Sequence, residues 1–532
     1  MNANDGEGEH QSSGAAQVEV DGERLSIADV VAVARFGAKV SLAPSALGAI
    51  ERSRALVEEI VARGDTIYGV NTGFGDLSTV SIPVDQLSDL QHNLLRSHSA
   101  GVGPPLPRDV VRAMLLLRAN ALAKGNSGVR PVLIERLIDL LNAGVTPVVP
   151  SQGSVGASGD LAPLAHLSLV LFGEGFATLG DETEPLPGAE ALRVAGLEPL
   201  DLTAKEGLAL INGTQQMTAI GALALHDAEL LLETAEVAAA ASLEALRGTD
   251  TPFDAEIQAV RPHPGQVRVA QRMRRLLAGS EILASHRDHA VDPRVQDPYS
   301  LRCTPQVLGA SWDAADYVRR VLEIELNSAT DNPLCFPIDP AERTESDYGR
   351  VLSGGNFHGQ PVAIAMDFLK IAMAEVASIS ERRTYLMLDP ARSGLPAFLS
   401  PAAGVQSGYM IAQYTAAALV SENKTLAHPA SVDSIPTSAG MEDHVSMGPI
   451  AARGAVSIIA NTAHVLAIEL LCAVQGVEQH KPLRAGRGVV EVAERLRAAI
   501  PPLTADRMPS PDIERVTELI RAGEFRLSEF GV

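Results

Sequence analysis

Cysteine is scarce in this chain of 532 residues, which contains only Cys303, Cys335 and Cys472, all far apart. No Cys-x-x-Cys pair occurs, so the sequence predicts neither a disulfide framework nor a cysteine-built zinc site. Buried free thiols are the expected state of all three. Aromatic residues are also few, at 4% with a single tryptophan, which fits close helix packing through alanine.

Positive charge is in short supply as well. The chain has 43 Lys and Arg against 65 Asp and Glu, and its formal net charge is −22. That charge repels phosphate backbones, and no compact basic run offsets it, so we expect no nucleic acid partner. No stretch has the apolar length of a membrane span, and the N-terminus lacks the features of a secretory signal. We therefore expect a soluble, cytoplasmic protein with no membrane partner.

Apolar residues at helical spacing dominate the rest of the chain. Three long segments rich in Ala and Leu, 214–246, 357–383 and 450–475, are apolar around much of their circumference. Such helices belong inside a bundle or an oligomer interface. Strand signals are few and short, at 66–70 and 145–149. The sequence therefore predicts a mainly α protein, a long-helix bundle with a smaller mixed N-terminal domain.

Composition also suggests the domain boundaries. Residues 1–24 are polar and acidic and predict a disordered tail. Residues 25–230 form the expected N-terminal domain with an Ala-Ser-Gly loop, and residues 231–532 the central helical bundle and C-terminal helices. Loops rich in Gly, Ser and Asn next to apolar helices are candidates to form a site. These loops are 68–75, 151–160, 212–216, 353–358 and 434–447.

The loop at 151–160 precedes a nearly all-apolar helix. Asp160 is a suitable N-cap for that helix, so the loop lies at a positive helix end. Its glycines permit backbone angles that bring the nitrogen of Gly159 onto the carbonyl carbon of Ala157. Cyclisation with loss of water, including the hydroxyl of Ser158, would give an electrophilic methylidene-imidazolone. Taken alone, an Ala-Ser-Gly tripeptide indicates only a structural turn.

A longer string around this tripeptide changes that interpretation. Residues 153–166 read Gly-Ser-Val-Gly-Ala-Ser-Gly-Asp-Leu-Ala-Pro-Leu-Ala-His, which resembles the signature of the aromatic amino acid ammonia-lyase and aminomutase family. The resemblance continues in order from about residue 25 to the C-terminus. It implies the long-helix fold of this family and a 4-methylidene-imidazol-5-one (MIO) group formed from residues 157–159, with no need for pyridoxal phosphate or a metal. It also implies a homotetramer whose active sites each draw residues from three chains.

The resemblance assigns roles to three residues in the polar loops. Tyr68 matches the general base of the family, and removing a proton from carbon requires a positioned base with an altered pKa. Asn212 is implied to contact the prosthetic group and the substrate carboxylate, and Phe357 to lie beside the imidazolone ring. Without the resemblance, these residues would be interpreted as a structural tyrosine, a helix cap and a core aromatic.

A turn-like segment supplies Gln296, Tyr299 and Arg302 together. An enzyme acting on an amino acid needs a cation for its carboxylate, and a planar guanidinium binds that group through two hydrogen bonds. The resemblance implies this role for Arg302, a position near the electrophile for Tyr299 and substrate contact for Gln296. A surface ion pair is the competing interpretation of Arg302.

Two positions bear on the substrate. His98, preceded by Ser97, lies where the family selects the substrate ring; histidine-specific members carry this pair, and some tyrosine aminomutases share it. Members acting on uncharged rings usually have glutamine at the position of Glu442, where histidine-specific members have glutamate. A carboxylate suits an imidazole N–H or an ammonium group and is costly beside a phenyl ring. The neighbouring Asp443 and His444 suggest a metal site, but no third ligand accompanies them.

The resemblance thus implies elimination of ammonia from L-histidine to give trans-urocanate, the first step of histidine degradation. A tyrosine or phenylalanine lyase or aminomutase is the nearest alternative. A non-enzymatic helical assembly protein that has kept the scaffold is an alternative of another class. A nucleotide site is weaker, because neither glycine-rich phosphate-binding motif occurs in the polar loops.

Overall fold

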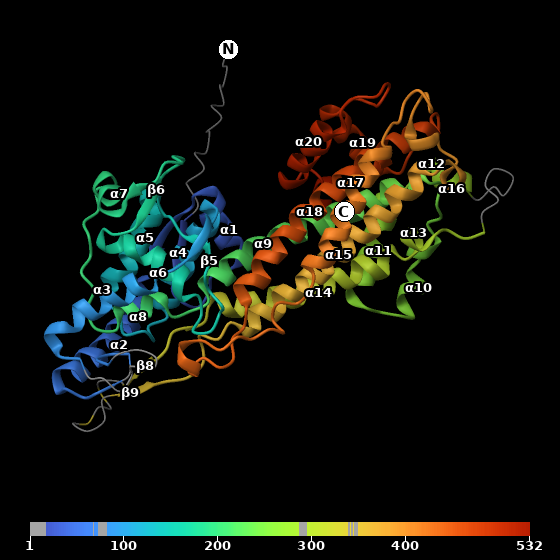
Figure 1. Ribbon diagram of the computed structural model, residues 1–532. Helices are drawn as coiled ribbons and strands as arrows, with labels where there is room; N and C mark the ends of the chain where they lie inside the picture. Colours follow the sequence, from blue (N-terminus) through green and yellow to red (C-terminus); the bar gives the residue numbers. More distant parts are fainter. Residues whose placement is uncertain are drawn as a thin grey trace, which may run out of the picture. The chain divides into compact units, whose positions relative to one another are not determined.

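The computed structural model describes residues 17–67, 69–72, 82–286, 295–338, 341, 344 and 349–532. The chain forms two compact units, and helices dominate both of them (Figure 1). The first unit comprises Met1–Ser154, Ser158–Ala219 and Leu326–Phe357, and the second Val155–Ala157, Ile220–Glu325 and His358–Val532. Each unit is built from separate stretches of the chain, whereas the sequence-based prediction divided it into consecutive blocks, 25–230 and 231–532.

The first unit combines helices with small sheets. Its helices are α1 (Ile27–Phe36), α2 (Pro44–Arg63), α3 (Leu87–His98), α4 (Arg108–Ala123), α5 (Pro131–Ala143), α6 (Leu161–Leu169), α7 (Gly188–Val194) and α8 (Glu206–Ile211). Its strands are β1 (Gln17–Val20), β2 (Lys39–Leu42), β3 (Val102–Pro105), β4 (Val145–Pro147), β5 (Pro150–Gln152), β6 (Phe176–Leu179), β7 (Leu186–Pro187), β8 (Leu334–Pro337) and β9 (Gly349–Leu352). β1 pairs with β2 in parallel, whereas β3–β5, β4–β6–β7 and β8–β9 are antiparallel.

The second unit consists of helices joined by loops, and no strand lies among its described residues. The long helix α9 (Gln215–Ala245) begins in the first unit and continues into this one. The helices that follow are α10 (Ala255–Ala259), α11 (Pro264–Leu276), α12 (Glu281–His286), α13 (Tyr299–Arg302), α14 (Thr304–Leu326), α15 (Gln360–Leu388), α16 (Pro390–Ser393), α17 (Met410–Leu426), α18 (Gly448–Val477), α19 (Arg487–Ala499) and α20 (Pro509–Arg521).

The long helices α9, α15 and α18 match the three long apolar segments predicted from the sequence. Within the second unit α15 packs along α18 (Figure 1). The stretch Gly448–His480, which contains α18, is long and apolar enough to cross a membrane by length and composition. The expectation that no stretch has this character was therefore wrong. In the structure 72% of its most apolar window is buried, as in a core helix that packs on every side.

The strand β1 corrects the predicted disordered tail at 1–24. Val18 pairs with Val40 of β2, and Val20 pairs with Leu42. The side chains of Val18 and Val20 are buried while their neighbours are exposed, so the segment has one apolar face for the core. The polar composition of the whole tail hid this short alternation. Residues 1–16 lie outside the described part of the chain.

Of the two predicted strands, 145–149 contains β4, and 66–70 is not a strand in its described residues. There the side chain of Asn71 accepts a hydrogen bond from the Ile67 N–H at 2.9 Å and donates to the Asp65 carbonyl at 2.8 Å. These bonds close a turn, because an asparagine side chain can substitute for backbone partners.

Candidate active site

Residues 155–157 of the predicted cyclising loop belong to the second unit. Ala157 is buried and clusters with Val445 and Met447. The carbonyl of Gly156 accepts a hydrogen bond from the Ser446 hydroxyl at 2.9 Å, and the carbonyl of Val155 accepts one from the Met447 N–H at 2.9 Å. The segment before α18 therefore fixes the backbone that leads into the tripeptide.

Gly159 occupies a position that only glycine fits. Its φ is +74°, in the left-handed region that disfavours other residues. A Cβ atom there would lie 2.2 Å from the carbonyl oxygen of Gly213, because the two glycines form a parallel β-bridge. The N–H of Asp160 also donates to the Gly213 carbonyl at 2.7 Å. The loops at 158–160 and 212–215 are thus in direct contact.

Asp160 precedes α6 as predicted, but its side chain makes no hydrogen bond that caps that helix. Its carboxylate instead accepts hydrogen bonds from the backbone N–H groups of Gln216 and Met217, at 2.9 and 3.0 Å, in the first turn of α9. The prediction that the Asp160 side chain caps α6 is therefore wrong, because this carboxylate binds the first turn of α9 instead. A carboxylate at the N-terminus of a long helix is stabilised by unpaired N–H groups and by the helix dipole.

Asn212 lies against the predicted cyclising tripeptide. Its Nδ2 donates to the carbonyl oxygen of Ser158 at 3.0 Å. Its Oδ1 is buried and has no hydrogen-bond partner among the described residues. In an imidazolone made from residues 157–159, the ring oxygen is this same Ser158 oxygen. The residues present therefore fit the group, with a donor at its oxygen and glycine where the ring nitrogen must be.

His98 is the last residue of α3 and is half-buried. Its Nδ1 lies 2.9 Å from the Leu94 carbonyl and 3.1 Å from the Ser97 hydroxyl. The carbonyl can only accept, so Nδ1 is the protonated nitrogen that donates to it. Two residues after the helix cap, the N–H of Gly101 donates to Nε2 of His166 at 3.1 Å. His166 on α6 thereby holds the backbone that follows His98.

The bond from Gly101 to His166 makes the stability of this turn pH-dependent. Burial lowers the pKa of His166 below its ordinary 6.5, and the bond requires an unprotonated Nε2. Since the folded-state pKa is the lower one, the stabilisation is complete above 6.5 and is lost as the pH falls through the folded value. The unfolding temperature of the parent should fall as the pH is lowered from about 7.5 to about 5. We expect the fall for His166→Gln to be smaller by roughly 2 °C, because glutamine does not titrate.

Differential scanning fluorimetry at both pH values measures this difference. His263→Gln, at an exposed position, is the matched control and should follow the parent chain. The same pH dependence in the parent and in His166→Gln would show that the imidazole does not titrate in this range.

Three further predicted residues lie on or just before α13, in the second unit. The guanidinium carbon of Arg302 is 4.6 Å from the centroid of the Tyr299 ring, a cation–π contact. The Nε of Arg302 is buried and has no partner among the described residues. Tyr299 is 70% exposed, and Gln296 is also exposed. The Nε–H of Arg302 thus remains available as a hydrogen-bond donor, whereas a surface ion pair would engage the guanidinium donors.

Glu442 is held by its own loop. The Thr437 hydroxyl donates to Oε2 of Glu442 at 2.5 Å, and the backbones of the two residues form an antiparallel bridge. Glu442 is half-buried, so its carboxylate is oriented without being removed from solvent. Nearby, the rings of His358 and His444 stack with centroids 5.9 Å apart. Within the described residues no group of three or more His, Cys, Asp or Glu side chains could hold a metal.

The structure brings Asn212 together with Ser158 and Gly159 in the first unit, and Tyr299 together with Arg302 in the second. Phe357, the last residue of the first unit, is half-buried, and Tyr68 lies outside the described residues. Sequence reasoning missed the bonds from Ser446 and from the backbone of α9. No sequence signal pairs such residues, because their partners are backbone groups far along the chain.

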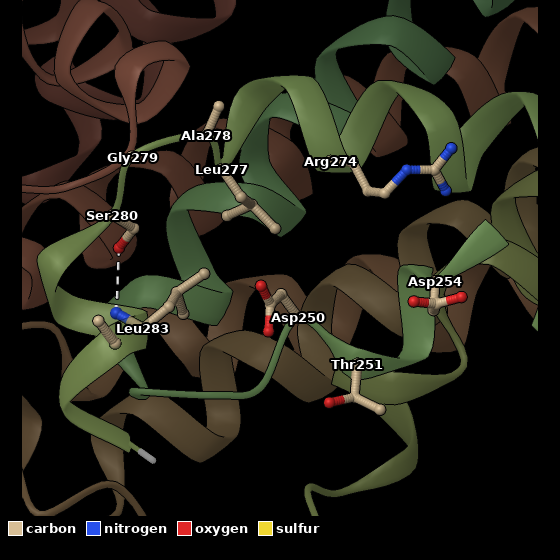
Figure 2. A pocket seen from close by; sticks show the side chains of 10 residues that line it. Asp250, Thr251, Asp254, Arg274, Leu277, Ala278, Gly279, Ser280 and Leu283 are labelled. Atoms are coloured by element: carbon tan, nitrogen blue, oxygen red, sulfur yellow. Dashed lines mark hydrogen bonds between the residues drawn. The ribbon is translucent and has the colours of Figure 1, made fainter. Parts of the chain in front are cut away.

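A surface pocket of about 490 Å³ in the second unit contains none of the predicted site residues (Figure 2). Asp250 and Asp254 line it opposite Arg274. Two of these side chains already have structural partners, since Asp254 caps α10 through the Glu256 N–H and Arg274 donates to the Phe253 carbonyl. The pocket therefore has no assigned part in the reaction.

Comparison with known proteins decides the family. The model of the family described as aromatic amino acid lyase matches residues 25–498. The chain belongs to the aromatic amino acid lyase family. It is 55% identical to a histidine ammonia-lyase of Deinococcus radiodurans over 94% of this chain and 93% of that protein. A histidine ammonia-lyase of Gloeobacter violaceus is also 55% identical, over 95% and 96% of the two chains.

Solved structures of this lyase family share the fold. The histidine ammonia-lyase of Trypanosoma cruzi superposes with a TM-score of 0.88 at 44% identity, covering 97% of this chain and 95% of that one. The tyrosine aminomutase of Streptomyces globisporus has a TM-score of 0.89 at 40% identity, covering 96% and 98%. The predicted long-helix fold of an aromatic amino acid lyase is thus confirmed.

Proposed function

We propose that this lyase eliminates ammonia from L-histidine without oxidation to give trans-urocanate, the first step of histidine degradation. The observation that carries the proposal is the 55% identity, over nearly the whole chain, to relatives named histidine ammonia-lyase. The glutamate at position 442 supports the same substrate, because a carboxylate pairs with an imidazole N–H or an ammonium group and is costly beside a phenyl ring.

The prosthetic group in this proposal is MIO, formed from Ala157, Ser158 and Gly159 without pyridoxal phosphate or metal. When formed, it supplies an electrophilic methylidene carbon that no ordinary side chain offers. Asn212 supports this assignment, since its amide donates to the Ser158 oxygen at 3.0 Å and would stabilise negative charge there. Gly159 supports it as well, because no side chain fits at that position.

The remaining roles are those implied by the family resemblance, and each fits the chemistry of its side chain. Arg302 binds the substrate carboxylate through its guanidinium donors, and Tyr68 removes the β proton of the substrate. Glu442 holds the imidazole. The predicted supporting residues are Tyr299, near the electrophilic carbon, Gln296 and His98, at the substrate, and Phe357, beside the prosthetic ring.

The proposal is tested by ultraviolet spectroscopy of the purified chain with single amino acids. Urocanate should accumulate with L-histidine, with an equal amount of ammonia released. The alternative supported by a specific observation is an aminomutase or lyase for tyrosine, since the aminomutase structure is similar and Ser97 with His98 suits both. Coumarate or β-tyrosine from L-tyrosine, with no urocanate from L-histidine, would overturn the proposal in favour of that alternative.

A homotetramer with active sites shared between chains is part of this proposal. On α15, Ile364, Phe368 and Ile371 are 46, 44 and 45% exposed. Their spacing of four and three residues places them on one helix face. A stripe of large apolar side chains on a long helix is typical of an interface, and a second copy of the chain is the proposed occupant.

Phe368→Glu should break this assembly, because it places a charge in the centre of the apolar stripe. We expect light scattering after size-exclusion chromatography to report a smaller particle than the parent, with activity reduced at least about tenfold if chains share sites. Val260→Glu, at an exposed apolar position on another helix end, is the matched control. An unchanged particle mass for Phe368→Glu would place the interface elsewhere.

A further inference from the structure

Arg118, near the C-terminal end of α4, is an arginine with no exposed surface. Its Nη1 donates to the main-chain carbonyl of Asn212 at 3.0 Å and to Oε1 of Gln215 at 2.7 Å. Among the described residues its Nε and Nη2 have no hydrogen-bond partner, and no carboxylate forms an ion pair with it. Burying an arginine without an ion-pair partner costs folding free energy. A functional role for the charge would explain why the chain keeps it.

The carboxylate that attracts Arg118 is shared with a second buried cation. Asp331 attracts the guanidinium, but its Oδ2 is already paired with Nζ of Lys205 at 2.6 Å, and both of those side chains are buried. Two cations thus share one anion. Burial lowers the pKa of Arg118 to about 10, so the group remains protonated at neutral pH. Arg118 therefore keeps its positive charge beside the loop at 212–215 while the carboxylate that attracts it is paired with Lys205.

The loop at 212–215 is shaped around the guanidinium. A Cβ at Gly213 would lie 2.4 Å from Nη1 of Arg118, a distance that real Cβ atoms do not show. Nε2 of Gln215 donates to the Thr330 hydroxyl at 2.9 Å, which fixes the acceptor that Arg118 uses. Arg118 thus contacts the backbone of the same residue whose side-chain amide donates to the Ser158 oxygen.

We propose that Arg118 is a positioning residue for the proposed lyase reaction: it fixes the main chain of Asn212, so that the Asn212 amide points at the Ser158 oxygen. The inference rests on the proposed function and adds a residue to it. The positive charge of Arg118 would also stabilise negative charge that develops on the Ser158 oxygen. Position and charge are separable, because lysine keeps the charge and glutamine keeps a donor.

Arg112 provides a matched control on the same helix. It is also buried, and its guanidinium donates to the carbonyls of Val33 and Leu141 at 2.9 and 3.1 Å. Neither acceptor belongs to the loops at 158–160 or 212–215. Replacing either arginine with methionine removes a buried guanidinium, so both variants should lose similar stability. Only Arg118→Met should change the chemistry.

The experiment compares the variants Arg118→Met, Arg118→Lys, Arg118→Gln and Arg112→Met as full-length oligomers. Thermal unfolding identifies a temperature at which all are folded, and there kcat and KM for L-histidine are measured. For Arg118→Met we expect kcat to fall about 10²-fold with KM within a few-fold, as for a misplaced oxyanion donor. The Lys and Gln variants should fall between Arg118→Met and the parent, and Arg112→Met should keep the parent kcat.

Intact mass gives a second measurement that needs no substrate. Cyclisation removes two water molecules, and a small thiol added afterwards reports how readily the electron-poor carbon reacts. A folded Arg118→Met that keeps the full mass, or that loses both waters but adds the thiol more slowly than Arg112→Met, supports the proposal. Equal mass, equal thiol addition and an unchanged kcat would overturn it. If the parent loses both waters and adds the thiol but does not convert L-histidine, the substrate assignment fails while the role of Arg118 is still tested.

Discussion

Ser158→Ala should abolish almost all ammonia release, lowering kcat with L-histidine by at least about 10⁴-fold while the protein stays folded. The reason is the hydroxyl oxygen of Ser158, which alanine lacks. Cyclisation and loss of water turn the Cβ of Ser158 into the electrophilic carbon, and alanine has no hydroxyl to lose. Asn212 would still donate to the carbonyl at 158, but that donor would have no electrophile to activate. Urocanate absorbance measures the loss, and thermal unfolding shows that the fold is kept.

A nearby hydroxyl in the same loop is the control for this change. Ser154 donates to Oδ1 of Asp160 at 3.2 Å but contributes no atom to the predicted ring. Ser154→Ala should therefore lose two waters on maturation and keep most of its activity, whereas Ser158→Ala should keep the full polypeptide mass. Urocanate formation at a near-parent rate by Ser158→Ala would remove the prosthetic group from the proposal.

The long helices could be predicted from the sequence because their signal is local. Each of α9, α15 and α18 has enough apolar residues over about eight turns to be recognised from composition and period alone. The strand β1 could not, since its alternation covers four residues inside a polar segment. Its stability comes from pairing with β2, which local sequence does not encode.

The predicted site depends more on tertiary contacts than on local signals. The glycine at 159 was predicted from a backbone requirement, and the structure adds the close approach of Gly213. The carboxylate of Asp160 looked like a cap for the helix that follows it but binds the first turn of α9. Two helix N-termini compete for one carboxylate there, and only the folded chain shows which one holds it.

The role of Arg118 could not be predicted from the sequence. It follows three leucines in a helix whose residues from 110 to 123 are all buried, so the usual expectation of an arginine facing solvent is wrong at this position. Its partners, Asn212 and Gln215, are more than ninety residues away. A charged residue inside an otherwise buried helix is a feature that sequence analysis can flag, but its purpose requires the contacts.

Glu442→Gln should change which amino acid the protein prefers. The Thr437 hydroxyl holds Oε2 of Glu442 at 2.5 Å, and glutamine keeps the size of the side chain and an acceptor for that bond. Glutamine loses the charge that favours an imidazole N–H or an ammonium group. We expect kcat/KM for L-histidine to fall about 10²-fold or more, because a partner group is left without its counter-charge. The value for L-tyrosine or L-phenylalanine should stay level or rise, since a half-buried carboxylate would no longer face their rings.

Two controls separate charge from shape in this prediction. Glu422→Gln removes a carboxylate from α17, where Oε2 accepts a hydrogen bond from Asn461, and should leave both substrates unaffected. Thr437→Val keeps the charge of Glu442 but releases its orientation, so it should weaken turnover of L-histidine less than Glu442→Gln does. If the ratio of kcat/KM for L-histidine to kcat/KM for L-tyrosine is unchanged in Glu442→Gln, this carboxylate does not select the substrate ring. Discrimination would then have to lie with the imidazole of His98, whose Nδ1 is held by the Leu94 carbonyl.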